Sequence, residues 1–124
     1  MTKKPHILVV EDDRWLAEHH VRVLQAAGYG ADFVSHAFDA IEAVDTRLLD
    51  LMILDVMLAG QNAFTLLHEL RSYSDLAHVP IVLCTNSAPD IVAEDAAVYG
   101  VIQILDKTIM QPQDVIAAVR KALL

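Results

Sequence analysis

The sequence predicts an α/β fold, a doubly wound sheet of five parallel strands with helices on both faces. Short apolar runs alternate with segments of helical periodicity, which is the pattern of repeated strand–helix units. The runs are continuously apolar rather than alternating, as expected of strands that are buried on both faces. The chain has 124 residues, of which 55% are apolar, so we expect a single domain over 1–124 with a substantial core.

The first strand–helix unit has the clearest boundaries. A strand over 6–10 precedes a helix over about 13–27, with Asp13 as its N-cap rather than as a metal ligand. Gly28 then ends the helix. The apolar stripe of this helix contains Leu16, Val23, Leu24 and Ala27.

The remaining elements follow in the same alternation. The sequence predicts further strands over 31–34, 50–54, 81–84 and 101–105, and helices over about 37–48, 63–71 and 89–98. A fifth helix begins near Pro112, because proline is favoured in the first helical turn. The helix over 89–98 has the thinnest apolar stripe and carries several acids, so it is the element that we expect to move most readily.

Charge and cysteine content exclude several classes of protein. The formal net charge of −8 argues against direct binding to nucleic acid and to anionic membranes. The single cysteine, Cys84, excludes an internal disulfide, and we expect it to be a small buried side chain. The basic start lacks the apolar core of a signal peptide, and no run approaches the ~18 apolar residues of a membrane span. We therefore expect a cytoplasmic protein.

Three acidic residues stand where two of the predicted strands end. Glu11 and Asp12 follow the first strand, and Asp55 follows the third. Ligand sites in open α/β sheets lie outside the carboxyl ends of the strands, so these carboxylates are expected to share one crevice. Like charges at close range need a cation or must retain a proton. An oxygen-only cluster suits a hard divalent ion, and Mg²⁺ is the usual choice beside phosphate chemistry.

The ends of the fourth and fifth strands add a hydroxyl and a cation, and with them the pattern resembles a known family. The sequence resembles the receiver domain of two-component response regulators over essentially its whole length. The segments that carry the resemblance are ILVVEDD (7–13), DLMILDVML (50–58), PIVLCT (80–85) and LDK (105–107). Their order and spacing are together highly specific. The resemblance implies a (βα)5 flavodoxin-like receiver fold.

The same resemblance implies a metal site and a phosphorylation site. Asp12 and Asp55 would bind Mg²⁺ directly, Glu11 through water, and Met57 through its backbone carbonyl. Asp55 would also be the phosphoacceptor, while the Thr85 hydroxyl and the Lys107 ammonium contact the phosphoryl group. A carboxylate is already a nucleophile, and phosphoryl transfer depends mainly on positioning and charge neutralisation, so these residue types suit the roles.

The resemblance also implies partners. The phosphoryl group would come from a sensor histidine kinase or a phosphotransfer protein, and a downstream effector would bind the face made by the fourth helix, fifth strand and fifth helix. The chain would be a monomer or a phosphorylation-linked homodimer. It would be a signalling phosphoacceptor that catalyses its own phosphorylation and dephosphorylation, rather than an enzyme acting on other molecules.

The chain departs from the family pattern at three places. Thr108 follows Lys107 where the family usually has a cis-proline, so we expect either a trans bond with a shifted Lys107 or a strained cis bond. Ile104 stands where many members have Tyr or Phe, so an aromatic switch is not available. The loop LAGQNAF (58–64) lacks the usual proline and Asp-Gly pair.

Two other functions compete with the phosphoacceptor. The first is a receiver-like module that binds proteins without phosphorylation, an idea favoured by the departures at Ile104 and Thr108 and opposed by the intact acidic and basic set. The second is a flavodoxin-like cofactor enzyme, which is disfavoured because the loop after the first strand is acidic and would repel phosphate. The six histidines show no metal-ligand spacing, and the sequence assigns them no metal role.

Overall fold

The predicted doubly wound architecture is confirmed. In the computed structural model, all strand pairs are parallel and the sheet has the order β2-β1-β3-β4-β5. The structure describes residues 4–36, 39–40, 49–55, 60–73, 76–86 and 88–124. The strands are β1 (His6–Val10), β2 (Gly30–Val34), β3 (Leu51–Asp55), β4 (Ile81–Thr85) and β5 (Val101–Asp106).

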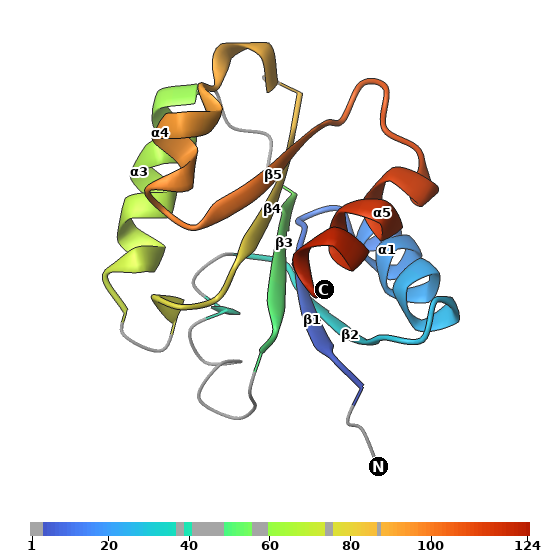
Figure 1. Ribbon diagram of the computed structural model, residues 1–124. Coiled ribbons are helices and arrows are strands. Elements are labelled where there is room, and N and C mark those ends of the chain that lie inside the picture. The colour runs from blue at the N-terminus through green and yellow to red at the C-terminus, as the bar shows by residue number, and fades with distance from the viewer. Residues whose placement is uncertain (1–3, 37–38, 41–48, 56–59, 74–75, 87) are drawn as a thin grey trace.

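Helices cover both faces of this sheet. Figure 1 shows α1 and α5 on one side of the strands and α3 and α4 on the other. The described helices are α1 (Arg14–Ala26), α3 (Gly60–Arg71), α4 (Ala93–Ala97), α5 (Pro112–Ala122) and the short 3-10 helix η2 (Ala88–Asp90). Within the described ranges, no helix has the length and apolar character needed to cross a lipid bilayer.

Alternation along the strands divides the core into two layers. Ile7 and Val9 of β1 pack with α1 and α5, whereas Leu8 and Val10 pack with α3 and α4. The same division holds in β3, because successive side chains of a strand point to opposite faces of the sheet. Both faces are therefore buried, which explains why these strands are continuously apolar in the sequence.

Several predicted element boundaries need correction. Strands β3, β4 and β5 each end one residue later than predicted, because Asp55 pairs with Cys84 and Thr85 pairs with Asp106 in the parallel ladder. Helix α3 begins earlier, at Gly60. The predicted helix over 37–48 lies almost entirely outside the described residues.

The helix predicted over 89–98 is much shorter in the structure. Only Ala93–Ala97 form an α-helix, and η2 precedes it. Val92 separates the two because its backbone is extended, with φ −79° and ψ 119°, and its side chain provides no cap. Of this helix, only Ala96 is buried. The scarcity of apolar anchors in the sequence thus corresponds to a short and weakly anchored element.

The ends of α1 follow the sequence prediction closely. Asp13 is the N-cap, and its side chain accepts a hydrogen bond from the backbone N–H of Leu16 at 3.2 Å. Gly28 lies just beyond the helix with φ +99°, a left-handed conformation that residues with a Cβ rarely adopt. Helix α1 therefore begins directly after the acidic residues that follow β1.

Replacing Asp13 with alanine is expected to cost about 1 kcal/mol of unfolding free energy, because the backbone N–H of Leu16, in the first turn of α1, loses its hydrogen-bond acceptor. Urea denaturation followed by circular dichroism measures this loss. Arg22→Ala is the matched control, since Arg22 is exposed on the same helix. Equal midpoints for the two variants would show that the cap contributes nothing.

Candidate functional site at the strand ends

The sheet topology brings Glu11 and Asp55 together. Strand β1 lies between β2 and β3, so β2 is added on one side of β1 and the later strands on the other. Ligand sites form at such a switch point in the strand order. Asp55 is the last residue of β3, and Glu11 follows β1 and continues its ladder by donating its N–H to the Val34 carbonyl at 3.0 Å. Both residues have the strand phase of the side chains that pack with α1 and α5.

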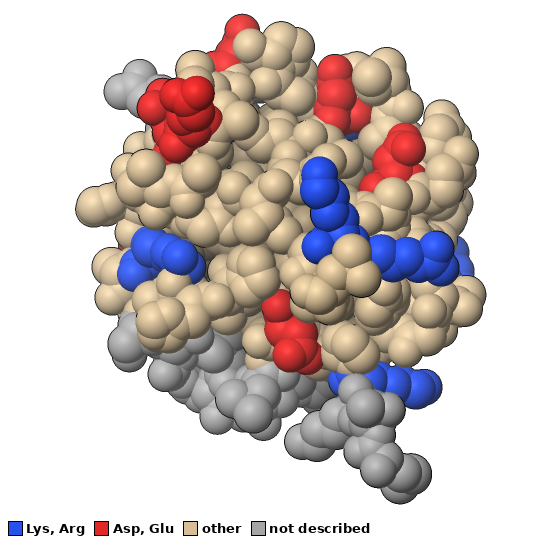
Figure 2. All heavy atoms as spheres, in the orientation of Figure 1, with Lys and Arg blue, Asp and Glu red and all other residues tan. Residues whose placement is uncertain are grey.

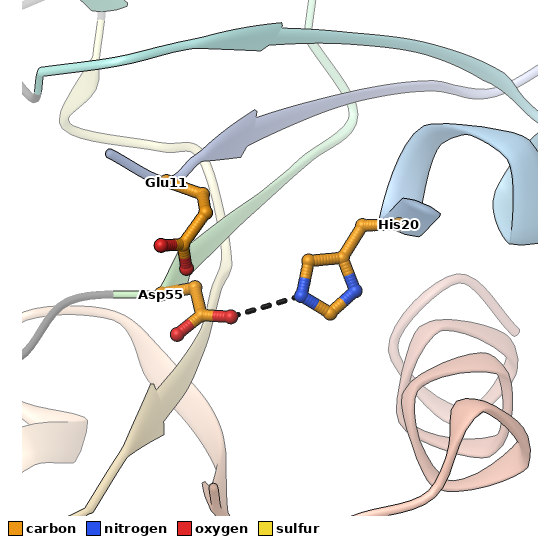
Figure 3. Close-up of side chains that lie close together, drawn as sticks. All are labelled: Glu11, His20 and Asp55. Carbon is orange, nitrogen blue, oxygen red and sulfur yellow. Dashed lines mark hydrogen bonds and ion pairs between the residues drawn. The ribbon is translucent and has the colours of Figure 1, made fainter. Parts of the chain in front are cut away.

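Two further side chains reach Asp55 in this crevice. His20 Nε2 lies 2.9 Å from Asp55 Oδ2, and both side chains are buried. Lys107 Nζ lies 2.6 Å from Asp55 Oδ1 and 3.6 Å from Glu11 Oε2. Figure 3 shows that the Glu11 carboxylate and the His20 ring both point toward Asp55, and that His20 extends from α1. Each oxygen of Asp55 is therefore next to a nitrogen of a different side chain.

The surroundings keep Asp55 ionised. Burial raises the pKa of its carboxyl group, but the hydrogen bonds from His20, Lys107 and Glu11 outweigh burial and hold that pKa below its ordinary value. Burial also acts against the charge of Lys107, yet its contact with Asp55 raises the Lys107 pKa on balance. The pair is thus a carboxylate and an ammonium at neutral pH.

The pKa of Glu11 is shifted in the opposite direction to that of Asp55. Burial, followed by its hydrogen bond to Asp55, raises the pKa of Glu11 to about 8. While Glu11 holds a proton, its carboxyl group can donate to Asp55. Once both groups are ionised, Lys107 is the cation beside them, and Glu11 Oε2 accepts no hydrogen bond from the described residues. Two buried carboxylate groups, one of them with an oxygen that lacks a hydrogen-bond partner, are a suitable donor set for a divalent cation.

The Lys107 position is fixed from both directions along the chain. Its N–H donates to the Thr85 carbonyl at 2.9 Å, which ties the end of β5 to β4. Asp106 Oδ1 then accepts from the N–H of Thr108 at 2.9 Å and from its hydroxyl at 2.6 Å. These two bonds lower the pKa of Asp106. They form a local turn of the kind that Asp side chains commonly stabilise.

This turn resolves the expectation at Lys107–Thr108. The described residues contain no cis peptide bond, so the trans alternative is correct, and Lys107 nevertheless reaches Asp55. Ile104 is half-buried and packs against the α3–α4 side of the core. Thr85 is fully buried at the end of β4, next to the strand that carries Asp55, and its hydroxyl role remains a prediction. Cys84 is buried as predicted, and burial raises the pKa of its thiol.

The acidic set differs from the predicted one. Among the described residues, the group whose ligand atoms all lie within 4.8 Å of one another is Glu11, His20 and Asp55. Asp12 does not belong to this group; it is exposed, because β1 has ended and the chain is turning into α1. Its role as a direct ligand stays a prediction. Met57, predicted to supply a carbonyl ligand, lies outside the described residues.

His20 is the residue that sequence reasoning missed. The sequence gives His20 no metal role, because no second histidine stands at metal-ligand spacing. The signal was present in a different form, since His20 lies four residues after Leu16 and four before Leu24, on the apolar stripe of α1. A polar residue on a core-facing stripe requires a polar partner, and Glu11 and Asp55 stand at the ends of the strands that this stripe could face.

The surface charge is uneven around the site. In Figure 2, most of the acidic side chains on the displayed face lie toward the edge at which the carboxyl ends of the strands are found in Figure 1, and basic side chains cross the middle. An acidic edge raises the local concentration of cations.

The fold and this constellation define a class of protein, and comparison with known families agrees. The family described as "Response regulator receiver domain" matches residues 7–120. The chain belongs to this family, and it is a response regulator receiver domain of two-component systems.

Individual relatives point the same way. The chain is 34% identical to the DNA-binding response regulator MtrA of Mycobacterium bovis, over 98% of this chain and 52% of MtrA. It is 37% identical to the transcriptional regulatory protein BaeR of Escherichia coli O6:H1, over 70% of this chain and 35% of BaeR. The chain spans about half the length of MtrA.

Solved structures confirm the fold. A sensor protein from Polaromonas sp. JS666 superimposes with a TM-score of 0.81 at 27% identity, covering 98% of this chain and 97% of that one. The chemotaxis protein CheY4 of Vibrio cholerae gives a TM-score of 0.79 at 20% identity, covering 98% and 100%. The flavodoxin-like receiver fold expected from the sequence is therefore correct.

Proposed function

We propose that Asp55 accepts a phosphoryl group from a phosphohistidine of a sensor kinase or phosphotransfer protein, with Mg²⁺ held by the acidic residues. The observation that carries this proposal is the buried, ionised Asp55 carboxylate with Lys107 Nζ 2.6 Å from its Oδ1. A carboxylate that is buried beside a lysine at the carboxyl-terminal edge of a sheet is both nucleophilic and protected from bulk water.

Each residue of the site has its own role in phosphoryl transfer. A carboxylate oxygen of Asp55 forms a bond to phosphorus as the bond from phosphorus to the histidine nitrogen breaks, and the electron pair of that bond returns to the imidazole. Lys107 neutralises charge on the phosphoryl oxygens, and the Thr85 hydroxyl donates to one of them. Glu11, Asp12, Asp55 and the Met57 carbonyl would hold Mg²⁺, which supplies electrostatic shielding between the two anions.

Phosphorylation would change the partner-binding face made by α4, β5 and α5. Three exposed apolar side chains support this assignment, since they lie after α4, on β5 and before α5; they are Val98, Ile102 and Ile109. The phosphoryl group adds about −1.5 to −2 of charge beside Lys107, which precedes α5 in the chain. The proposed output is a shift in the population of that face, recognised by an effector protein or a second copy of the chain.

Ile104 limits how this shift occurs. An isoleucine on β5 packs against the core and has no polar tip to follow the Thr85 hydroxyl, so the change must use backbone shifts or other packing. This observation keeps the phosphorylation-independent binding module as the rival function. We place the protein in the cytoplasm under either function. Under the favoured function it is a signalling phosphoacceptor that transfers the group to itself rather than an enzyme acting on other molecules.

Incubation with acetyl phosphate and Mg²⁺ is expected to add one phosphoryl group to the intact protein, detected by mass spectrometry. Asp55→Asn is expected to abolish the addition, because an amide is not a competent nucleophile. Asp32→Asn is the matched control, since Asp32 is exposed on the edge strand β2 and should leave the addition intact. No addition to the unmodified protein would favour the rival binding module.

A further inference from the structure

His20 lies where a cation bound to Asp55 must meet it. Lys107 Nζ is next to Asp55 Oδ1 at 2.6 Å, so a cation is directed to the other oxygen, Oδ2. That oxygen is the one 2.9 Å from His20 Nε2. A cation at Oδ2 therefore either displaces the imidazole or takes it as a ligand.

The spacing of the donor atoms favours ligation. Neighbouring ligands of an octahedral ion with bonds of about 2.1 Å are about 3 Å apart, and opposite ligands are about 4.2 Å apart. His20 Nε2 and Asp55 Oδ2 have the separation of neighbouring ligands, at 2.9 Å. Ligand atoms of Glu11, His20 and Asp55 all lie within 4.8 Å of one another, and all three side chains are buried. Only small shifts are needed to place one ion among them.

The surroundings of His20 permit the change of tautomer that ligation requires. In the structure Nε2 donates to the ionised Asp55, whereas a ligating Nε2 must carry a lone pair and leave its proton on Nδ1. A cavity of about 120 Å³ between α1 and α5 is lined in part by His20, His19, Val23 and Met110. Water in that volume can accept a hydrogen bond from Nδ1–H, and the ring has room to adjust its position.

We propose that His20 Nε2 is a nitrogen ligand of the divalent cation held by Glu11 and Asp55, and that the site consequently prefers Mn²⁺ to Mg²⁺. Carboxylate and water oxygens suit both ions, but an imidazole nitrogen favours the transition metal. The inference rests on the proposed function for the location of the cation at Asp55. It goes further by assigning a ligand on α1 and a metal selectivity to this chain.

Electron paramagnetic resonance of the Mn²⁺-loaded protein tests the ligand directly. A coordinated imidazole gives nitrogen hyperfine coupling in the echo-modulation spectrum, and histidine labelled with the heavier nitrogen isotope should change its pattern. His20→Gln is expected to remove the coupling. His19→Gln should retain it, because His19 is a histidine on the same helix that stacks on Trp15 instead. Bound Mn²⁺ without nitrogen coupling in the unmodified protein would overturn the proposal, whether or not the variants fold.

Calorimetric titration tests the selectivity. We expect His20→Gln to weaken Mn²⁺ binding by about tenfold or more and Mg²⁺ binding far less, so the affinity ratio of the two ions falls. An unchanged ratio would contradict the proposal. The acetyl phosphate experiment separates the two hypotheses: nitrogen coupling without phosphorylation refutes only the proposed function, and phosphorylation without nitrogen coupling refutes only the role of His20.

Discussion

Replacing Lys107 with methionine is expected to lower the unfolding free energy by about 3 kcal/mol in metal-free buffer, because two buried acidic groups lose the cation beside them. Lys107 contacts both Asp55 and Glu11, and its side chain is only 15% exposed. Methionine has a similar length, so the loss reports on charge rather than on packed volume. Urea denaturation at neutral pH with a chelator present measures the effect.

The size of this loss of unfolding free energy depends on the Asp55 charge that Lys107 leaves behind. Adding Asp55→Asn to Lys107→Met should recover most of the lost stability, since the buried charge is then removed as well. Divalent cation should also stabilise the single variant by replacing the missing positive charge. Lys121→Met is the control, because Lys121 is exposed at the end of α5. An equally small effect for both lysine variants would mean that Lys107 does not compensate the acidic pair.

The same variant is expected to lose phosphoryl transfer. Lys107 supplies the positive charge nearest to the proposed nucleophile, and removal of one such group typically costs about 100-fold or more in rate. The acetyl phosphate reaction, followed over time by intact mass, provides the rate. Stability and rate are thus separate readouts of one contact.

Replacing Glu11 with glutamine is expected to make the metal-free protein more stable at alkaline pH. The Glu11 pKa is raised by burial from 4.5 to about 8 on folding. Below the lower value both states hold the proton, and Glu11 has no effect on the pH dependence of folding. Between the two values the unfolded chain is ionised while the folded chain keeps its proton, so stability falls as pH rises, by about 1.4 kcal/mol per pH unit.

Asp55 does not reproduce this slope in the same pH window. The folded-state pKa of Asp55 is lowered, so its contribution is lost only as pH falls below the ordinary carboxyl range. The difference in unfolding free energy between Glu11→Gln and the unmodified protein should therefore grow by roughly 3 kcal/mol from about pH 5 to about pH 8. Parallel curves for the two proteins would show that Glu11 titrates normally. Saturating divalent cation should weaken the slope, because the ion binds the ionised form.

The fold and most of the candidate site could be predicted from the amino-acid sequence. Continuous apolar runs require strands buried on both faces, and their alternation with amphipathic segments leaves the doubly wound sheet as the arrangement that buries both element types. Glu11, Asp55, Thr85 and Lys107 could be located because each stands at the carboxyl end of such a run, and parallel strands bring these ends to one edge. The Asp13 cap and the Gly28 helix end followed from local backbone chemistry.

Which side chains meet depends on how the helices and strands pack in three dimensions. Strand parity and the packing of α1 direct His20 onto Asp55 across 35 positions of sequence, a contact that no local spacing encodes. The exposure of Asp12 depends on where β1 stops and α1 begins, and the turn at Thr108 depends on the Asp106 carboxylate, which accepts a hydrogen bond from the Thr108 N–H. Hydrophobic periodicity fixes which elements form, because burial follows composition along the chain. The identity and charge state of a buried polar contact depend on distances between elements, which exist only once the core has packed.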